Sequence, residues 1–358
     1  MRAVIFGAIL ALVIGATAAA IWGANSVQAP ESGRAVGVPP GSGSQPAINP
    51  SGAAQPPAVS RSRSAASATW ITLAPQSDPR QEMAVAELGG RIYAIGGFRG
   101  DGRSATTVEV YDPAADSWQT VAPLPAALNH PLAATVDDRL YVIGGHPEQG
   151  AEAVDTTYAY DAQTNTWTQR ARMPTARGAL AVGVVDGKIY AVGGSPDRRE
   201  RDLAVYDPQA DAWTPLAAMP TPRNHLAGGS VNGKFYAVGG RSGDIGGITA
   251  ILEEYDPATG AWTTRTPMST ARGGIAGVAA NGLLFVIGGE GNRNHPQGIF
   301  DQVEAYDPST DTWQSLPPMD VARHGIQAAV LGNRIYVPGG ATVEGFGVTP
   351  VNQALEIP

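Results

Sequence analysis

Residues 181–213, AVGVVDGKIYAVGGSPDRRERDLAVYDPQADAW, contain the pattern that decides the fold. A small apolar stretch leads into Asp186-Gly187, a strong signal for a two-residue hairpin turn. An aromatic and β-branched stretch follows and ends at Gly193-Gly194. Tyr206 is followed by Asp-Pro, which suits the first two positions of a type I turn. The segment therefore predicts four short antiparallel strands, the last of which begins at Trp213.

The same pattern recurs along the chain. Paired glycines end six apolar runs, at Gly96-Gly97, Gly144-Gly145, Gly193-Gly194, Gly239-Gly240, Gly288-Gly289 and Gly339-Gly340. A Tyr precedes a Trp by seven residues at Tyr111/Trp118, Tyr160/Trp167, Tyr206/Trp213, Tyr255/Trp262 and Tyr306/Trp313. Six units of about four strands each predict an all-β fold, a six-bladed β-propeller.

The ends of the repeat region predict how the propeller closes. The sixth unit lacks a fourth strand, whereas Trp70 stands ten residues before Arg80, as the other Trp residues stand before theirs. We therefore expect an N-terminal strand around Trp70 to complete the last blade, which removes an exposed sheet edge. The folded domain is predicted to span residues 69–358.

The double glycines, with Tyr and Trp at fixed separation, resemble the Kelch-repeat family over residues 69–358. The resemblance implies the same six-bladed propeller. Kelch propellers include adaptors, carbohydrate binders and enzymes, so the resemblance leaves the function open.

Composition narrows the chemistry. The chain of 358 residues has no Cys, which excludes disulfides, thiolate zinc sites and cysteine nucleophiles. It also excludes the copper and Tyr–Cys chemistry of Kelch-type galactose oxidases, and we expect no cofactor. A net charge of −8 argues against a nucleic-acid partner, which normally meets a basic surface.

The N-terminal region predicts export. Residues 3–22 form an apolar run behind Met1-Arg2, so residues 1–29 are interpreted as a signal peptide or an uncleaved membrane anchor. Residues 30–68 are rich in Ser, Gly, Pro and Ala and are interpreted as a disordered tether. We expect a monomeric propeller that is periplasmic, displayed at the cell surface or secreted, with no other membrane contact.

Alternating strand direction sorts the loops onto two faces. One face carries the loops between the second and third strands of each blade and the loops between blades. We call it the long-loop face. Variable loops on a rigid scaffold are where recognition usually takes place. The loop at residues 290–301 is long and polar and contains Phe300, so we favour it for contacting a partner, with Glu290, Asn292 and Arg293 as candidate ligand-binding residues.

Arginines recur at one position of the blade-to-blade loops, which we expect near the channel mouth: Arg80, Arg177, Arg223, Arg272 and Arg323. As an inward ring they would bind carboxylates. Alternatively, each fixes neighbouring backbone carbonyls, and we favour this structural role. The resemblance to Kelch adaptors, in which this segment lines a peptide-binding surface, keeps them as candidates. Blade two departs from the pattern with Leu128.

His130, His225 and His324 lie one or two residues past this position, and Asn129-His130 matches Asn224-His225. A metal site is disfavoured because His324 is offset by one residue and would face differently. We expect these histidines to be solvated or bonded to loops, and keep them as candidate ligand contacts.

Three functions are consistent with the sequence. We favour a binding module that recognises a protein, peptide or glycan through its long-loop face. The alternative is a periplasmic or secreted carbohydrate-active enzyme resembling sialic acid mutarotases or epimerases, with Glu82 or Glu290 as general acid or base. A purely structural role in an envelope assembly is the third. No catalytic residue is assigned.

Overall fold

The computed structural model describes residues 68–196 and 200–358. The predicted signal peptide or anchor (1–29) and nearly all of the predicted tether (30–68) lie outside the described residues. In the described part of the chain, no helix has the length and hydropathy that a membrane crossing requires.

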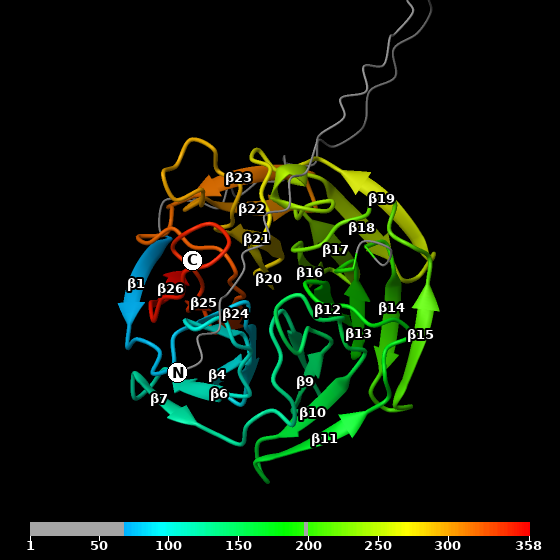
Figure 1. Ribbon diagram of the computed structural model, residues 1–358. Coiled ribbons are helices and arrows are strands. Elements are labelled where there is room, and N and C mark those ends of the chain that lie inside the picture. The colour runs from blue at the N-terminus through cyan, green and yellow to red at the C-terminus, as the bar shows by residue number, and fades with distance from the viewer. Residues whose placement is uncertain (1–67, 197–199) are drawn as a thin grey trace, which may run out of the picture. The chain divides into compact units, whose positions relative to one another are not determined.

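Six four-stranded antiparallel sheets, formed by the described residues, are arranged in a ring around a central axis (Figure 1). Blade one contains β3 (Ala84–Leu88), β4 (Arg91–Ile95), β6 (Val108–Asp112) and β7 (Ser117–Thr120). Blade two contains β8 (Leu132–Val136), β9 (Arg139–Ile143), β10 (Thr157–Asp161) and β11 (Thr166–Arg170). Blade three contains β12 (Ala181–Val185), β13 (Lys188–Val192), β14 (Leu203–Asp207) and β15 (Ala212–Leu216).

Blades four and five repeat this order. Blade four contains β16 (Ala227–Val231), β17 (Lys234–Val238), β18 (Leu252–Asp256) and β19 (Ala261–Arg265). Blade five contains β20 (Ala276–Ala280), β21 (Leu283–Ile287), β22 (Val303–Asp307) and β23 (Thr312–Leu316). Short elements outside the blades are β2 (Arg80–Gln81), which pairs with β5 (Phe98–Arg99), and the 3₁₀ helix η3 (Ile245–Gly247).

Blade six combines the two ends of the propeller. It contains β24 (Ala329–Leu331), β25 (Arg334–Pro338), β26 (Asn352–Glu356) and, as its outer strand, β1 (Thr69–Leu73). The register of the last pair runs from Thr69 opposite Glu356 to Leu73 opposite Asn352. The prediction of a six-bladed propeller closed by an N-terminal strand is therefore confirmed.

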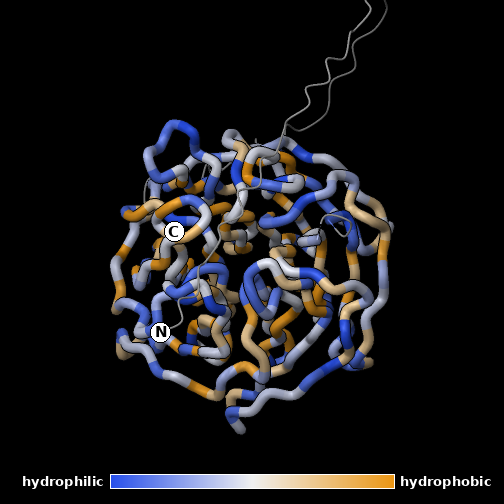
Figure 2. The backbone as a smooth tube through the Cα atoms, in the orientation of Figure 1, coloured by the Kyte–Doolittle hydropathy of each residue, from blue (hydrophilic) through white to orange (hydrophobic). Residues whose placement is uncertain are grey.

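The hydrophobic core lies between neighbouring blades. Tyr206 of blade three, for example, packs with Leu132 and Ile143 of blade two, and all three side chains are buried. Figure 2 shows hydrophobic stretches along the strands and hydrophilic stretches in many loops. Because each sheet contributes both of its faces, apolar burial fixes the blades to one another as well as forming each blade.

The paired glycines join each blade to the next. A Cβ atom at Gly144 would lie 2.1 Å from the carbonyl oxygen of Arg177 in the next inter-blade loop, so no larger residue fits there. The backbone N–H of the second glycine donates to the carbonyl oxygen at the arginine position of the next inter-blade loop. These bonds run from Gly97 to Leu128, Gly145 to Arg177, Gly194 to Arg223, Gly240 to Arg272, Gly289 to Arg323 and Gly340 to Arg80.

The tryptophans join the blades at the outer edge. Each indole N–H donates to a backbone carbonyl of the preceding blade-to-blade segment, at 2.8–3.1 Å. The pairs are Trp70 with Pro317, Trp118 with Ala74, Trp167 with Ala122, Trp213 with Ala171, Trp262 with Ala217 and Trp313 with Thr266. The Trp residues are therefore scaffold that repeats around the ring.

A tyrosine contact reinforces four of these junctions. The hydroxyl group of the blade Tyr donates to an Asp or Asn side chain five residues later, and that side chain also accepts a backbone N–H from the segment that the Trp contacts. The acceptors are Asp116, Asn165, Asp211 and Asp311. Blade four has Gly260 at this position, after Tyr255.

The closure can be tested by removing the strand that completes blade six. Deletion of residues 69–74 should lower the free energy of unfolding by about 3 kcal/mol or more, because the hydrogen bonds between β1 and β26 are lost. Urea denaturation measures this. Trp70→Phe, which removes only the indole bond, should cost about 1 kcal/mol. An unchanged denaturation midpoint after the deletion would show that β1 does not clasp the ring.

Gly260→Asn should stabilise the domain by about 1 kcal/mol. The backbone there has φ +69°, which Asn tolerates, and a Cβ atom would lie 3.8 Å from the Tyr255 hydroxyl oxygen. An amide oxygen could then accept from that hydroxyl group, as Asn165 does from Tyr160. Thermal unfolding measures the effect. Gly150→Asn is the matched control, because its φ is +75° and its Cβ would have no neighbour within 4 Å; equal shifts in both variants would contradict the contact.

Candidate functional site

Six residues, each two positions past the arginine position, form a closed ring around the axis, which we call the axial ring. Its members are Glu82, His130, Ala179, His225, Gly274 and Gly325. The backbone N–H of each donates to the carbonyl of the preceding member at 2.8–3.1 Å, and Glu82 closes the ring onto Gly325. All six have a left-handed backbone, with φ between +50° and +61°. The ring thus fixes the direction of every side chain that it carries.

A cavity of about 470 Å³ opens beside the axial ring on the long-loop face. Glu82, His130 and His225 line it together with Arg241, Glu290 and His324, and the loops around Phe98, His146 and Phe346 complete its wall. A space of about 20 Å³ is lined by axial ring residues, and a separate cavity of about 240 Å³ lies among the first strands of the blades. The polar side chains therefore gather at the mouth, where ligands are typically bound.

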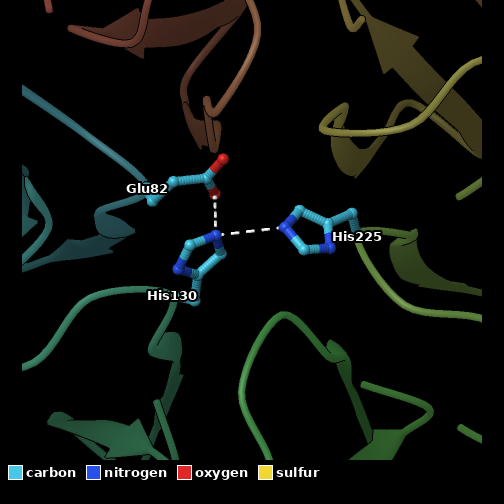
Figure 3. A group of neighbouring side chains, drawn as sticks. All are labelled: Glu82, His130 and His225. Carbon is cyan, nitrogen blue, oxygen red and sulfur yellow. Dashed lines mark hydrogen bonds and ion pairs between the residues drawn. The ribbon is translucent and has the colours of Figure 1, made fainter. Parts of the chain in front are cut away.

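Two histidines and a carboxyl group meet at the floor of the mouth (Figure 3). The Nε2 atoms of His130 and His225 lie 3.1 Å apart. One carboxylate oxygen of Glu82 lies 3.5 Å from His130 Nε2. These side chains come from the loops that precede blades one, two and four, so the fold alone brings them together.

Asparagines set the ring orientation of both histidines. Nδ1 of His130 lies 2.6 Å from Oδ1 of Asn129, and Nδ1 of His225 lies 2.6 Å from Oδ1 of Asn224. Nδ2 of Asn129 donates to Ser104 Oγ and to the His146 carbonyl, while that of Asn224 donates to Glu200 and to the Gly243 carbonyl. Because the amide oxygens can only accept, each histidine donates from Nδ1.

An ion pair forms the next part of the wall. Nη1 of Arg241 lies 2.6 Å from Glu290 Oε1, and Nη2 lies 3.1 Å from Nε2 of His225. The other Glu290 oxygen lies 3.2 Å from Nδ1 of His324, whose Nε2 donates to the Val343 carbonyl. Arg241 and Glu290 follow directly after glycine pairs, so they occupy equivalent positions of neighbouring blades.

Burial shifts the titration of the cluster strongly. It raises the pKa of Glu82 to about 8, an effect that Glu290 reinforces and Arg241 opposes. Burial lowers the pKa of His130 to about 3 and that of His225 well below its ordinary value, and Arg241 reinforces both shifts. Perturbed groups in a cleft mark a candidate site.

The five arginines do not line the mouth, which corrects the expectation that placed them there. Arg80, Arg177, Arg223, Arg272 and Arg323 are fully buried. Each guanidinium group donates to the carbonyl of a second strand and to the carbonyl before a third strand; for Arg272 these acceptors are Val286 and Gln302. The arginines therefore have the structural role of fixing neighbouring backbone carbonyls, and they form no anion-binding ring.

Three of these arginines also have a buried glutamate partner. The pairs are Arg80 with Glu109, Arg223 with Glu253 and Arg272 with Glu304, at 2.6–2.8 Å. Blade two, which has Leu128 in place of the arginine, has Tyr158 in place of the glutamate, and both side chains are buried in one apolar cluster. The charged pair and the apolar pair thus occupy the same place in the repeat.

The loop at 290–301 is divided between two places. Glu290 lines the mouth, whereas Asn292 and Arg293 line a separate hollow of about 380 Å³ on the same face. Phe300 is buried and does not face a partner, which corrects the expectation for this side chain. Asn292 bonds within the loop, to the Ile299 carbonyl, and Arg293 is exposed.

Several wall residues are not among the candidates that the sequence predicts. They are Arg241, His146, Asn129 and Asn224, and Glu82 is predicted only as a general acid or base. A usable signal was the repeat position: Arg241 and His146 directly follow glycine pairs, and Glu82 aligns with His130 and His225.

Comparisons with known proteins agree with this architecture. The model of the KLHDC2/KLHL20/DRC7 Kelch-repeats domain matches residues 62–219, and that of the Kelch motif matches residues 222–269 and 271–320. The chain therefore belongs to the Kelch-repeat family. The structure titled "Structure of YjhT" is similar, with a TM-score of 0.66 and 18% identity over 78% of this chain and 95% of that one; this likeness shows the fold.

Curated relatives match over short segments. Kelch-like protein terF of Aspergillus terreus is 39% identical over 69 residues, which cover 19% of this chain and 15% of the relative. Mouse Kelch-like protein 1 and human Kelch-like protein 4 are 43% and 40% identical over 47 residues, covering 13% of this chain and 6% of each relative. The chain thus matches only a small part of the length of these relatives.

Arg272→Ala should lower the free energy of unfolding by about 3–5 kcal/mol, because Glu304 would remain buried without its partner. Urea denaturation measures this, with Arg293→Ala at the exposed loop as the control, where we expect no measurable change. The double variant Arg272→Leu with Glu304→Tyr copies blade two and should retain more stability than Arg272→Leu alone. Equal stability of Arg272→Ala and Arg293→Ala would contradict a scaffold role for Arg272.

Proposed function

We propose that this protein is a binding module that receives a segment of a partner protein in the mouth cavity of the long-loop face. The observation that carries the proposal is the cavity of about 470 Å³, in which the wall residues Glu82, His130 and His225 belong to a closed ring of backbone hydrogen bonds. Protein interaction is also the general role of Kelch propellers. A wall that is held before binding loses little conformational entropy when a ligand enters.

Apolar side chains at the edge of the cavity support a protein partner. Phe346 and Val343 are 41% and 44% exposed and are the exposed large hydrophobic residues of the described chain. Phe346 lines the mouth, whereas Val343 lines the separate hollow on the same face. The rings of Phe346 and Phe98 lie 6.2 Å apart, edge to face, and both line the mouth. Exposed apolar groups beside a polar pocket are typical of interfaces in which a few anchors carry most of the affinity.

The charges of the mouth favour a neutral or basic segment. The cavity wall has carboxyl groups from Glu82, Glu148 and Glu290, whereas its one guanidinium group, from Arg241, is already paired with Glu290. An acidic ligand would therefore meet no unpaired cation among the described wall residues. A basic side chain would donate hydrogen bonds to the carboxyl oxygens.

One observation favours the second candidate, a carbohydrate-active enzyme. With its pKa raised to about 8, the Glu82 carboxyl group is protonated at neutral pH and faces the open cavity, as a general acid would. Against it, the buried arginines cannot hold an acidic sugar.

Export belongs to the same proposal. An apolar run at residues 3–22 and a Ser/Gly/Pro-rich stretch at residues 30–68 support display of the propeller outside the cytoplasm, as a monomer.

Selection of a random peptide library against the immobilised full chain tests the proposal. We expect neutral or basic peptides that bind at one site, with a dissociation constant measured by fluorescence anisotropy. Phe346→Ser should weaken binding about tenfold or more, because the exposed anchor is lost. Lys188→Ser, in the hairpin between β12 and β13 on the opposite face, is the matched control and should leave the affinity unchanged.

A panel of glycans that includes acidic sugars supplies the contrary outcome. Saturable sugar binding that Arg241→Ala abolishes, with no peptide selected, would overturn the protein-partner proposal. Mutarotation of an acidic sugar by the wild type, lost in Glu82→Gln, would establish the second candidate.

A further inference from the structure

Glu82, His130 and His225 present three metal-binding atoms to one point at the floor of the mouth (Figure 3). One carboxylate oxygen and the two Nε2 atoms all lie within 4.8 Å of one another. From this geometry we propose that the three residues bind a divalent first-row transition metal ion. The proposal does not depend on the proposed function.

The hydrogen bonds of the two histidines are the strongest support for a bound metal ion. Since Nδ1 of each ring donates to an asparagine oxygen, the Nε2 atoms of the neutral rings carry lone pairs. The two Nε2 atoms lie 3.1 Å apart, and His225 Nε2 also lies 3.1 Å from Nη2 of Arg241. Such an arrangement is repulsive unless a positive group lies between the nitrogens, and a metal ion supplies one. Orientation of metal-binding histidines by an outer hydrogen bond is also the usual design of metal sites.

The distances fit an ion held by all three residues. Metal–nitrogen bonds of about 2.0–2.1 Å place two ligand atoms about 2.8–3.4 Å apart, the shorter distances in octahedral and the longer ones in tetrahedral coordination. The observed separations are 3.1 Å between the nitrogens and 3.5 Å between His130 Nε2 and the Glu82 oxygen. Small side-chain rotations would complete the site.

The surroundings leave the Glu82 carboxylate available. It accepts no hydrogen bond from any residue in the ranges 68–196 and 200–358, although its side chain is only 13% exposed. A Cβ atom at Gly325 would lie 2.8 Å from one of its oxygens, so the glycine makes room for the carboxylate. A bound cation would displace the carboxyl proton and stabilise the charged form of this buried group.

The donors select the class of metal. Two imidazole nitrogens and one carboxylate oxygen suit Zn²⁺, Fe²⁺, Co²⁺ or Ni²⁺, whereas Ca²⁺ and Mg²⁺ prefer oxygen ligands. Three protein ligands leave coordination positions for molecules in the mouth cavity. The expectation of no metal site relied on the offset of His324, but Glu82 occupies the equivalent position in the axial ring.

Arg241 is the competing group. Its Nη2 donates toward Nε2 of His225 at 3.1 Å and would have to turn away, while Glu290 continues to hold Nη1. The other charged or titratable groups that face the cluster are Glu290, His146 and His324. Removing the guanidinium group should therefore strengthen metal binding.

Calorimetric titration of the chelator-treated full chain with Zn²⁺ tests the proposal. We expect one ion bound per chain and a rise in the thermal unfolding temperature with Zn²⁺ concentration. His130→Ala and His225→Ala should each weaken binding at least about 100-fold, and Glu82→Gln about tenfold or more. Arg241→Gln should tighten binding severalfold. Co²⁺, which has visible absorption bands when bound by nitrogen ligands, should report the two histidines directly.

Another histidine serves as the matched control. His295→Ala should leave the Zn²⁺ affinity unchanged, because this residue lines the separate hollow and does not belong to the cluster. Circular dichroism first verifies that each variant is folded. If the histidine variants do not fold, Asn129→Leu keeps all three donors, frees the His130 ring and should weaken binding at least tenfold.

Three results would overturn the proposal: no Zn²⁺ binding to the folded wild type, binding that survives in both His130→Ala and His225→Ala, or binding that His295→Ala abolishes. If one of these results is obtained, the proposed function still holds when the selected peptides bind with the same affinity in the presence and absence of a chelator. The two proposals can therefore fail separately.

Discussion

The hydrogen bond from the second glycine of one blade to the arginine-position carbonyl of the next is the contact on which the ring depends. It is the middle of three concentric circuits between blades. Indole N–H groups form the outer circuit, and the axial ring forms the inner one. Each circuit passes through the junction between the last blade and the first, at Gly340 and Arg80 in the middle circuit and at Gly325 and Glu82 in the inner one. Bonds of about 1 kcal/mol each therefore act together, because opening the ring at one junction breaks a bond in each of the three circuits.

The buried arginines serve this arrangement. Each guanidinium group satisfies carbonyl groups at the end of a strand, where the glycine pair interrupts the sheet ladder. Buried carbonyl groups without a hydrogen-bond donor would destabilise the fold. The planar guanidinium group, with several N–H donors in fixed directions, is well suited to satisfy them. In blade two, Leu128 and Tyr158 occupy the places of the arginine and the glutamate, so apolar packing replaces the charged pair there. A residue repeated in nearly every blade is thus explained by the strand ends and does not require a ligand.

The fold could be predicted from the sequence because spacing alone specifies it: glycine pairs, Tyr–Trp pairs and the isolated Trp70 define six blades and their closure. The site could be predicted only in part. The arginine position was found, but its side-chain direction depends on burial that spacing does not show. Two residues later, the left-handed backbone turns Glu82, His130 and His225 toward the axis. A non-glycine residue with positive φ is uncommon, and no local signal marks it. Arg241 could not be predicted for a related reason: no sequence pattern indicates that it lies beside His225.

Function in this propeller is concentrated where the repeats differ. The six axial ring positions have the same backbone bonds and dihedral angles, yet three carry Glu, His and His while three carry Ala, Gly and Gly. The small residues are part of the site, because a side chain at Gly274 would meet Glu290 and one at Gly325 would meet Glu82. Since the backbone bonds do not depend on these side chains, the chemistry of the mouth can change without changing how the blades are joined. A closed ring of identical contacts therefore supports an asymmetric site at its centre.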